Sequence, residues 1–170
     1  TLKALSKGGI TYKGFLYAGL MIKDNNPYLI EYNVRMGDPE CQTILPILKS
    51  DLLEIFFANT NQKLKEINIE WTNKKSLCVV LCSNGYPDKY EKNIEIDNLE
   101  KLKLDNDNLL FHAGTKINNY KTYATGGRVL NFVSVGDNFK SAKKNVYSNL
   151  ERVNWKHGFF RKDIGYKIRD

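Results

Sequence analysis

The chain has 170 residues, a formal net charge of +7 and 42% hydrophobic residues, including 10 Tyr and 8 Phe. This length holds one ordinary domain or two small ones with a buried core, and the composition excludes an intrinsically disordered chain. The lysines are scattered among asparagines, without a block of five or six like charges. We therefore interpret the positive charge as a solvated surface and expect no nucleic-acid partner.

The cysteines and histidines form neither a disulfide pattern nor a metal-binding pattern. Cys78 and Cys82 lie in one apolar run, where four strand residues span roughly 13 Å, beyond the separation of about 7 Å that a disulfide permits. His112 and His157 lack the spacing of a zinc site. Free thiols indicate a reducing compartment, and no apolar run has the length of a membrane span or the pattern of a signal peptide. We expect a soluble cytoplasmic protein without a membrane partner.

The first part of the chain predicts a hairpin flanked by helices. Turn residues at 24–27 separate two apolar runs, which are therefore expected to pair as antiparallel strands. The expected elements are a helix ending at Gly8-Gly9, strands at 15–22 and 28–33, a short helix from Pro39 toward Pro46, and a helix at 52–58 capped by Asp51. Residues 59–74 are mostly polar and rich in asparagine, and we place a domain boundary there.

The second part of the chain predicts strands and one amphipathic helix. Apolar positions recur every three or four residues after Asp137, which is expected to open that helix. The expected strands lie at 77–82, 93–96, 109–113, 121–124 and 129–135. Short strands separated by turns, with one packing helix, indicate an α+β fold. We expect residues 1–65 to form one domain, 66–75 a linker and 76–170 a second domain.

The strand expected at 28–33 carries the most informative residues. By the two-residue strand period, Glu31 and Asn33 share one face, and Arg35 joins them if the chain stays extended. The two oxygen-bearing side chains sit roughly 6.7 Å apart along the backbone, so they can converge on Mg²⁺, which takes its other ligands from phosphate and water. Arg35 adds a positive fork suited to phosphate. The pattern predicts a phosphate or acyl-phosphate site, although a solvated strand face alone also explains Glu-x-Asn.

Asp38 and Pro39 predict the start of a helix, because Pro fits the first helical position and Asp can cap the free amides. Such a start attracts anions, and capping is compatible with a substrate contact by Asp38. The sequence has no Gly-rich phosphate loop, since Gly8-Gly9 and Gly126-Gly127 are isolated pairs, and neither histidine lies in a catalytic-triad setting. On these residues alone, the chain lacks the parts of a complete nucleotide-using enzyme.

The motifs, taken in order, resemble those of the glycinamide ribonucleotide synthetase family (phosphoribosylamine–glycine ligases), ATP-grasp enzymes of purine biosynthesis. The string from Glu31 to Glu40 is the most specific. The matching strings are Gly14–Leu20, Ile30–Gln42, Leu48–Leu52, Phe111–Thr115, Thr125–Val129 and Phe160–Gly165. The resemblance implies the C-terminal portion of an ATP-grasp fold, with an antiparallel hairpin plus helices, followed by a small mostly-β C-terminal domain with one packing helix.

The resemblance also implies a reaction, in which ATP with Mg²⁺ or Mn²⁺ drives the joining of glycine to 5-phosphoribosylamine through a glycyl phosphate. By this resemblance Glu31 and Asn33 bind the metal, and Arg35 and Asp38 act in catalysis. The implied substrate-binding residues are Arg35, Gly37, Asp38, Glu40, Gly126, Gly127 and Arg128. For the last three, a tight turn that enters a strand is an equally good explanation.

Several features depart from the family pattern. Many ATP-grasp relatives carry an acidic metal ligand on the preceding strand, whereas residues 15–22 contain none. Arg161 and Asp163 fit either a ligand contact or an interdomain ion pair. The family's N-terminal domain, lid and adenine-binding segment have no counterpart in this sequence. We therefore expect those missing segments as partners, exposed apolar surface on residues 1–65, and no ligase activity of this chain alone.

Two other hypotheses come from different functional classes. The first is a non-catalytic module, derived from the same fold, that binds a partner or a nucleotide. The Glu31, Asn33 and Arg35 face favours the ligase over this module, because a binding module has no need of metal ligands. The second is an RNA-binding domain, suggested by charge and aromatic residues. It is disfavoured because no strand carries an RNP-like aromatic string.

Overall fold

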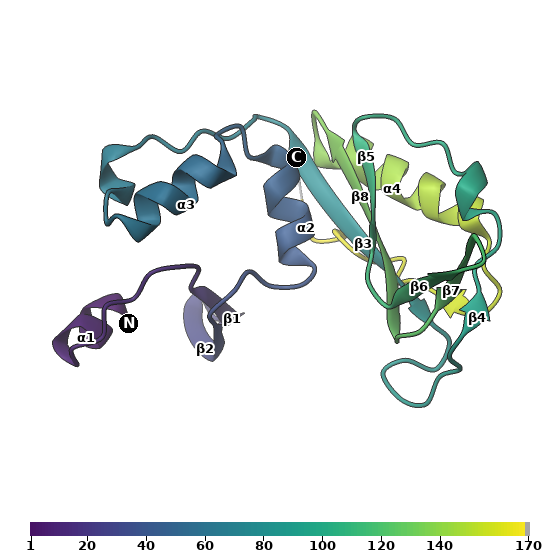
Figure 1. Ribbon diagram of the computed structural model, residues 1–170, viewed down its shortest axis with the longest axis horizontal. Helices are drawn as coiled ribbons and strands as arrows, with labels where there is room; N and C mark the ends of the chain where they lie inside the picture. The colour runs from purple at the N-terminus through teal and green to yellow at the C-terminus, as the bar shows by residue number, and fades with distance from the viewer. Residues whose placement is uncertain (169–170) are drawn as a thin grey trace. The chain divides into compact units, whose positions relative to one another are not determined.

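The computed structural model describes residues 1–168. The chain forms two compact units, which are described separately (Figure 1). Unit 1 comprises Thr1–Cys41 and Leu48–Thr72. Unit 2 comprises Gln42–Ile47 and the described residues from Asn73 onward. The domain limits and the linker expected from the sequence stay a prediction.

Unit 1 consists of a β-hairpin and short helices. Its elements are α1 (Leu2–Lys7), β1 (Tyr17–Lys23), β2 (Asn26–Asn33), α3 (Leu52–Thr60) and the 3-10 helix η2 (Leu64–Glu66). Helix α2 (Glu40–Ile44) begins in unit 1, and its later residues belong to unit 2, where the 3-10 helix η1 (Leu45–Ile47) follows. Asp51 caps α3 as predicted, because its side chain accepts hydrogen bonds from the backbone N–H groups of Leu53 and Glu54 at 2.7 and 3.3 Å.

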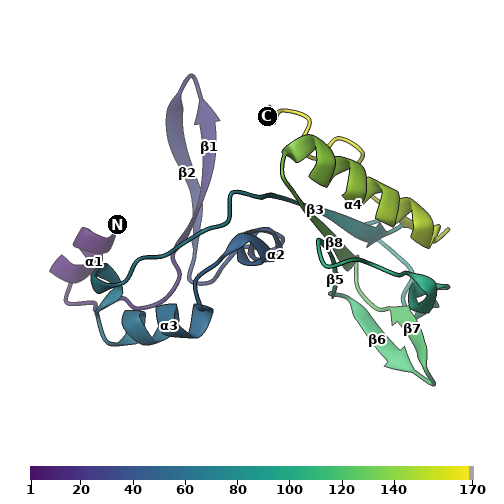
Figure 2. The same ribbon diagram turned by 90° about the horizontal axis from the view of Figure 1, so that it is seen from above.

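A two-residue turn joins the strands of the hairpin. Asp24 and Asn25 have φ values of 51° and 60°, left-handed values that Asp and Asn tolerate and that short hairpin turns require. A bulge between Gly19 and Leu20 shifts the strand register. The hairpin stands out from the rest of its unit (Figure 2), and most residues on both of its faces are exposed. It is therefore a ribbon with little packing of its own.

Unit 2 contains two antiparallel sheets and one long helix. The larger sheet has the order β5-β8-β3-β9, and the smaller has the order β4-β7-β6. The elements are β3 (Lys75–Ser83), β4 (Ile94–Glu95), the 3-10 helix η3 (Leu99–Lys101), β5 (Asn108–His112), β6 (Thr115–Asn118), β7 (Lys121–Ala124), β8 (Arg128–Gly136), α4 (Phe139–Val153) and β9 (Gly158–Phe159). Helix α4 packs on the central strands β3 and β8 (Figures 1 and 2).

The hydrophobic core lies between α4 and the larger sheet. Strands β3 and β8 are buried along nearly their whole length. The buried residues of α4 follow the spacing of an amphipathic helix, and they are Ala142, Val146, Leu150 and Val153. Trp155, just after the helix, is 8% exposed and donates its indole N–H to the backbone carbonyl of Glu95 at 2.9 Å. The predicted α+β fold with one packing helix is confirmed.

The structure corrects two predicted helix starts. The N-cap of α4 is Asn138, one residue after the predicted Asp137, because the Asn138 side chain accepts the N–H of Ser141 at 2.8 Å. Helix α2 begins at Glu40, since Asp38 and Pro39 form a turn that precedes the first helical residue. Pro39 therefore stands before the helix, and α2 is only five residues long.

Strand β6 is an element that the sequence does not predict. It pairs with β7 through a turn at Asn119 and Tyr120, whose φ values are 48° and 62°. Tyr rarely adopts this left-handed conformation, so the turn carries no strong sequence signal. Residues 115–118 also lack an apolar run.

Two further features bear on the cellular setting. Cys41, Cys78 and Cys82 are free thiols. Within the part of the chain that the structure describes, no helix combines the length and the apolar character needed to cross a membrane.

Candidate metal and phosphate site on the hairpin

Glu31 and Asn33 lie side by side at the end of β2. The amide nitrogen of Asn33 donates a hydrogen bond to Glu31 Oε1 at 2.9 Å. Because the amide carries an oxygen beside that nitrogen, both side chains can present oxygen to the same cation. The strand period thus brings together the two residues that the sequence singled out as metal ligands.

The bulge in the hairpin decides what lies across from this pair. Gly19 is paired with Glu31, and Tyr17 with Asn33. Residues directly opposite each other in an antiparallel pair point to the same face, so Tyr17 shares the face of the two oxygen-bearing side chains. A Cβ on residue 19 would lie 3.1 Å from Cγ of Glu31. Glycine at this position therefore leaves the Glu31 carboxylate room to move.

Tyr17 connects this face to the start of α2. Its hydroxyl donates a hydrogen bond to Glu40 Oε1 at 3.1 Å. That hydrogen bond and the negative charge of Glu40 raise the pKa of Tyr17, and the charge of Glu31 adds to the effect. Glu31 and Glu40 thus both act on one phenol. The face carries two carboxylates, an amide and a hydroxyl, a donor set that suits a hard divalent cation.

The loop between β2 and α2 folds tightly around Glu40. Gly37 is buried, and a Cβ there would lie 2.1 Å from Glu40 Oε2. Any larger residue at position 37 would displace the carboxylate. Asp38 is exposed in the turn before α2. Glu40, Gly37 and Tyr17 therefore fix one another, and the Glu40 carboxylate is held in a defined place.

Arg35 is not placed by the strand rule. Strand β2 ends at Asn33, and Val34 and Arg35 form a bend. The guanidinium is exposed and donates to the backbone carbonyl of Met36 at 2.9 Å. The chain is not extended at Arg35, so the prediction that Arg35 shares the strand face of Glu31 and Asn33 is not supported by strand alternation.

The donor set fits Mg²⁺ or Mn²⁺. These ions accept one or two carboxylates from protein and complete their coordination with phosphate oxygens and waters. Residues 1–168 contain no cluster of three or more His, Cys, Asp or Glu side chains suited to a metal. Glu31 and Asn33 supply two oxygen ligands, which are enough for an ion that takes its remaining ligands from phosphate and water. Glu40 lies near the same face through its contact with Tyr17.

The predicted residues Gly126, Gly127 and Arg128 belong to unit 2, and packing explains both glycines. A Cβ on Gly127 would lie 2.1 Å from the ring of Tyr86, and one on Gly126 would lie 3.0 Å from Cα of Gly114. Both glycine carbonyls accept hydrogen bonds from Ser83, at 2.8 Å from its N–H and 2.9 Å from its hydroxyl. The segment is a close-packed turn into β8, which explains the glycines without a ligand.

Arg161 and Asp163, which the sequence left open, pair with each other. The guanidinium donates two hydrogen bonds to the carboxylate, at 2.9 and 2.6 Å. This pairing lowers the pKa of Asp163 and raises that of Arg161. Both residues are exposed members of unit 2. The ion pair is therefore local, between residues two positions apart.

Tyr17 and Gly19 share the face of the proposed metal ligands, but the sequence did not predict them as part of the candidate site. A two-residue turn at 24–25 with unbroken pairing would set Tyr17 opposite Tyr32, on the other face from Glu31. The bulge reverses this assignment. The available signal was the Gly14–Leu20 string, which contains both residues but does not show which face they occupy.

Comparison with known proteins identifies the domains. Residues 1–41 match the family model described as "Phosphoribosylglycinamide synthetase, ATP-grasp (A) domain". The Glu31–Asn33 face therefore belongs to a segment of ATP-grasp type. Residues 76–167 match the model described as "Phosphoribosylglycinamide synthetase, C domain".

Individual proteins are similar over nearly the whole chain. The phosphoribosylamine–glycine ligase of Caldanaerobacter subterraneus subsp. tengcongensis is 45% identical over 95% of this chain and 38% of its own length. The ligase of Fusobacterium nucleatum is 44% identical over 97% of the chain and 39% of its own length. A crystal structure of the Thermotoga maritima ligase superposes with a TM-score of 0.80 and 34% identity, covering 96% of this chain and 40% of that one.

The chain belongs to the phosphoribosylglycinamide synthetase family. It spans about two fifths of the length of the curated relatives that it matches. The family resemblance inferred from the sequence is confirmed, and so is the division of the fold into an ATP-grasp end and a C domain.

Proposed function

We propose that this chain carries the metal-binding hairpin and the C domain of a phosphoribosylamine–glycine ligase. The whole enzyme would consume ATP to activate the glycine carboxylate as glycyl phosphate. The amine of 5-phosphoribosylamine would then displace the phosphate to give glycinamide ribonucleotide, with ADP and phosphate released. We place this reaction in the cytoplasm.

The proposed roles follow from the chemistry of each group. Mg²⁺ or Mn²⁺, when bound, supplies positive charge that offsets the charge of the transferring phosphate. Glu31 and Asn33 would hold it, and the exposed guanidinium of Arg35 would neutralise phosphate oxygens beside it. Asp38 would act beside Arg35 in orienting the reacting groups. Such chemistry needs positioned charge more than covalent help from the protein.

Substrate contacts complete the proposal. Gly37 and Glu40 would border the place of glycine and the ribosylamine together with Asp38. The contact between Glu40 and Tyr17 supports this role, because it keeps a carboxylate in place as a hydrogen-bond acceptor for an amine. We also propose substrate contacts for Gly126, Gly127 and Arg128 of unit 2, on the resemblance alone.

The observation that carries the proposal is the 2.9 Å contact between Asn33 and Glu31 on the face that Tyr17 and Gly19 share. A solvated strand face has no need of a glycine opposite its carboxylate or of a second carboxylate tethered by a phenol. An Mg²⁺–phosphate site uses all of these features. The proposed function therefore accounts for the whole local arrangement.

The test combines this chain with the remaining segments of the enzyme, supplied as a separate polypeptide. ADP release that depends on both glycine and 5-phosphoribosylamine is expected from the mixture and not from this chain alone. Glu31→Ala should abolish turnover in the mixture, while Glu151→Ala, an exposed residue of α4, should leave it unchanged. Turnover by the chain alone would contradict the expected dependence on the other segments. A Mg²⁺–nucleotide titration unaffected by Glu31→Ala would favour the non-catalytic module.

A further inference from the structure

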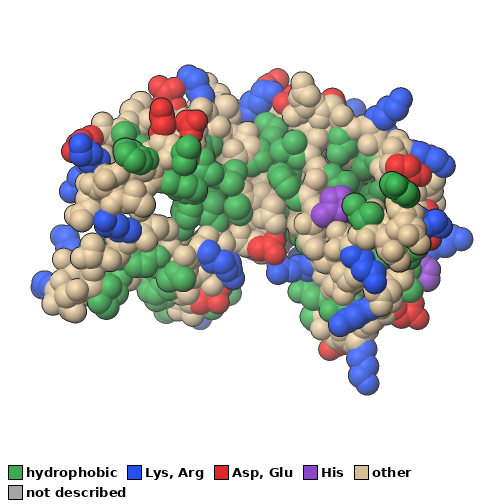
Figure 3. Space-filling model, in the orientation of Figure 1, with side chains coloured by type: hydrophobic (Ala, Val, Ile, Leu, Met, Phe, Trp, Pro, Cys, Tyr) green, Lys and Arg blue, Asp and Glu red, His purple; other side chains and the backbone are tan. Residues whose placement is uncertain are grey.

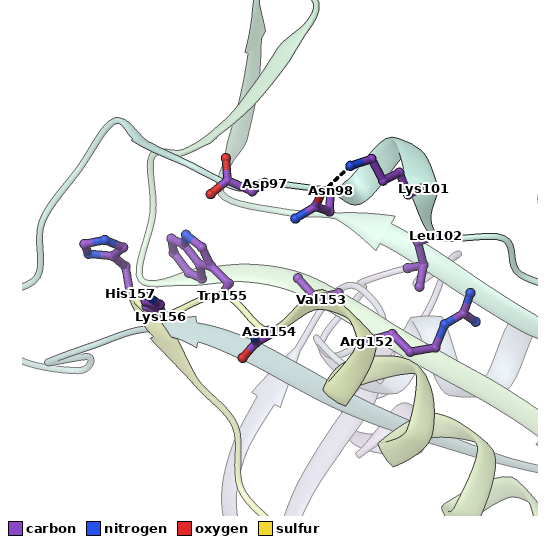
Figure 4. A pocket seen from close by; sticks show the side chains of 10 residues that line it. All are labelled: Asp97, Asn98, Lys101, Leu102, Arg152, Val153, Asn154, Trp155, Lys156 and His157. Carbon is purple, nitrogen blue, oxygen red and sulfur yellow. Dashed lines mark hydrogen bonds between the residues drawn. The ribbon is translucent and has the colours of Figure 1, made fainter.

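A hollow of about 590 Å³ opens in unit 2 between the end of α4 and the segment around η3 (Figure 4). This volume is within the range of small-molecule sites. Trp155 and Val153 are its buried residues, and the indole is fixed by its hydrogen bond to the Glu95 carbonyl. The hollow therefore has a rigid floor, and it involves none of the residues proposed for the ligase reaction.

Charged side chains ring this hollow unevenly. Lys101, Arg152 and Lys156 line it with a single carboxylate, Asp97. Figure 4 shows Lys101 and Arg152 at one end and His157 at the other, with Trp155 between them. The rim therefore carries an excess of positive charge with one acidic group partway along it.

The lysine and arginine groups of the rim lack acidic partners. Lys101 donates to the neutral Asn98 side chain at 2.8 Å. Arg152 donates to the backbone carbonyl of Lys103 at 3.1 Å and to Asn149 at 3.3 Å. Across residues 1–168 no ion pair joins Lys101, Arg152 or Lys156 to a carboxylate.

Two other exposed lysines of unit 2 do have acidic partners. Lys74 and Lys121 pair with Asp107 and Glu95, each at 2.8 Å. At the hollow, Lys101 and Arg152 are oriented by uncharged acceptors, so their positive charge stays available to a ligand.

The C-terminal end of α4 disfavours an anion in this hollow, and its charge can be compared with the net charge of the lining residues. Helix α4 ends at Val153, and the carbonyl end of a helix carries roughly half a negative charge. Three cations against Asp97 leave two net positive charges on the lining. The half charge lowers this excess but does not cancel it, so the hollow remains electrostatically suited to an anion.

We propose that this hollow binds a small phosphate monoester of a polyol, with the phosphate at the end formed by Lys101 and Arg152. Asp97 and Asn98 lie along the rim, where they would accept hydrogen bonds from hydroxyl groups. The polar lining suits a sugar phosphate better than an apolar ligand. The site is independent of the ligase reaction proposed for the hairpin.

The test is an NMR titration of ¹⁵N-labelled chain at constant ionic strength. The probes are glucose 6-phosphate, inorganic phosphate and glucose. Glucose 6-phosphate is expected to shift the Trp155 indole N–H and the Asn98 side-chain amide, and to bind more tightly than inorganic phosphate, while glucose alone has no effect. Lys101→Gln and Arg152→Gln should each weaken binding by about two- to fivefold, the effect of one exposed charge pair.

Lys144→Gln is the matched control, because Lys144 is exposed on α4 outside the hollow. It removes the same charge and should leave the affinity unchanged. Equal weakening by Lys144→Gln would show only general attraction of anions to a basic protein and would overturn the proposal. Equal affinity for inorganic phosphate and glucose 6-phosphate, or shifts confined to residues outside the hollow, would overturn it as well.

Discussion

Removing the charge of Glu31 is the sharpest perturbation of the proposed cation site. Glu31→Gln keeps the size of the side chain and its ability to accept a hydrogen bond from Asn33, which now spans 2.9 Å. It removes one negative charge from a face on which the Tyr17 hydroxyl also donates a hydrogen bond to the Glu40 carboxylate. Any loss of cation binding then reports charge and not shape.

The expected loss can be worked from the exposure of the site. Glu31 is exposed, so the dielectric of water applies, and two unit charges about 4 Å apart interact by about 1 kcal/mol. A divalent ion doubles this to about 2 kcal/mol, which corresponds to about a 30-fold rise in Kd. Direct coordination brings the charges closer, so this figure is a lower bound.

The assay is paramagnetic broadening of amide resonances by Mn²⁺, which detects weak sites. In the unaltered chain, broadening should centre on residues 31–33 and reach Tyr17. Glu31→Gln should raise the Mn²⁺ concentration for half-maximal broadening by about 30-fold. Glu54→Gln on α3 should change this concentration by less than about twofold. Unchanged broadening in Glu31→Gln, or an equal loss in Glu54→Gln, would refute the assignment of Glu31 as a ligand.

Three further predictions concern other parts of the chain. Glu40→Gln should lower the raised pKa of Tyr17 toward about 10, measured by ¹³C NMR of labelled tyrosine, with Tyr17→Phe assigning the resonance. Pairing with Arg161 lowers the pKa of Asp163, so its stabilisation is present above the unfolded value of about 3.9 and lost as pH falls through the lowered one. Asp163→Asn should therefore lower Tm slightly at neutral pH and have no effect at about pH 2 by circular dichroism. Leu150→Ala, at a position 2% exposed, should destabilise unit 2 by about 2–5 kcal/mol in urea unfolding.

Much of the fold is predictable because local chemistry and burial agree. The helix at α3 follows from an Asp cap before an apolar run, and its side chain makes the expected hydrogen bonds. Strands β3 and β8 are largely apolar runs because both strands are buried along nearly their whole length. In each case one segment contains the whole signal, so no knowledge of a distant partner is needed.

The composition of the site is predictable only in part, for a physical reason. Glu31 and Asn33 belong to one strand, and strand alternation places them on one face. Tyr17 and Gly19 reach that face only because a bulge shifts the pairing by one residue. A one-residue shift moves every side chain of a strand to the other face, and a bulge depends on strand pairing that the sequence of either strand does not reveal.

Packing within unit 1 bears on how well its site can hold a cation. Ala58 is the one buried hydrophobic side chain of that unit, whereas large apolar residues of the hairpin and α3, such as Ile30 and Phe57, are 64% and 71% exposed. Apolar side chains gather over α3 and over the hairpin region in Figure 3. Unit 1 thus has the exposed apolar surface that the sequence resemblance led us to expect, and such surface is typical of interaction sites.

An isolated two-stranded hairpin is marginally stable, and a productive site must hold its groups within about 0.5 Å. Covering the apolar residues of the hairpin would restrict the motion of β2 and hence of Glu31 and Asn33, which lie on that strand. Part of the cost of ordering the ligands would then be met before the cation arrives. Cation affinity should therefore rise when the rest of the enzyme is supplied, even though both proposed ligands, Glu31 and Asn33, are already present in this chain.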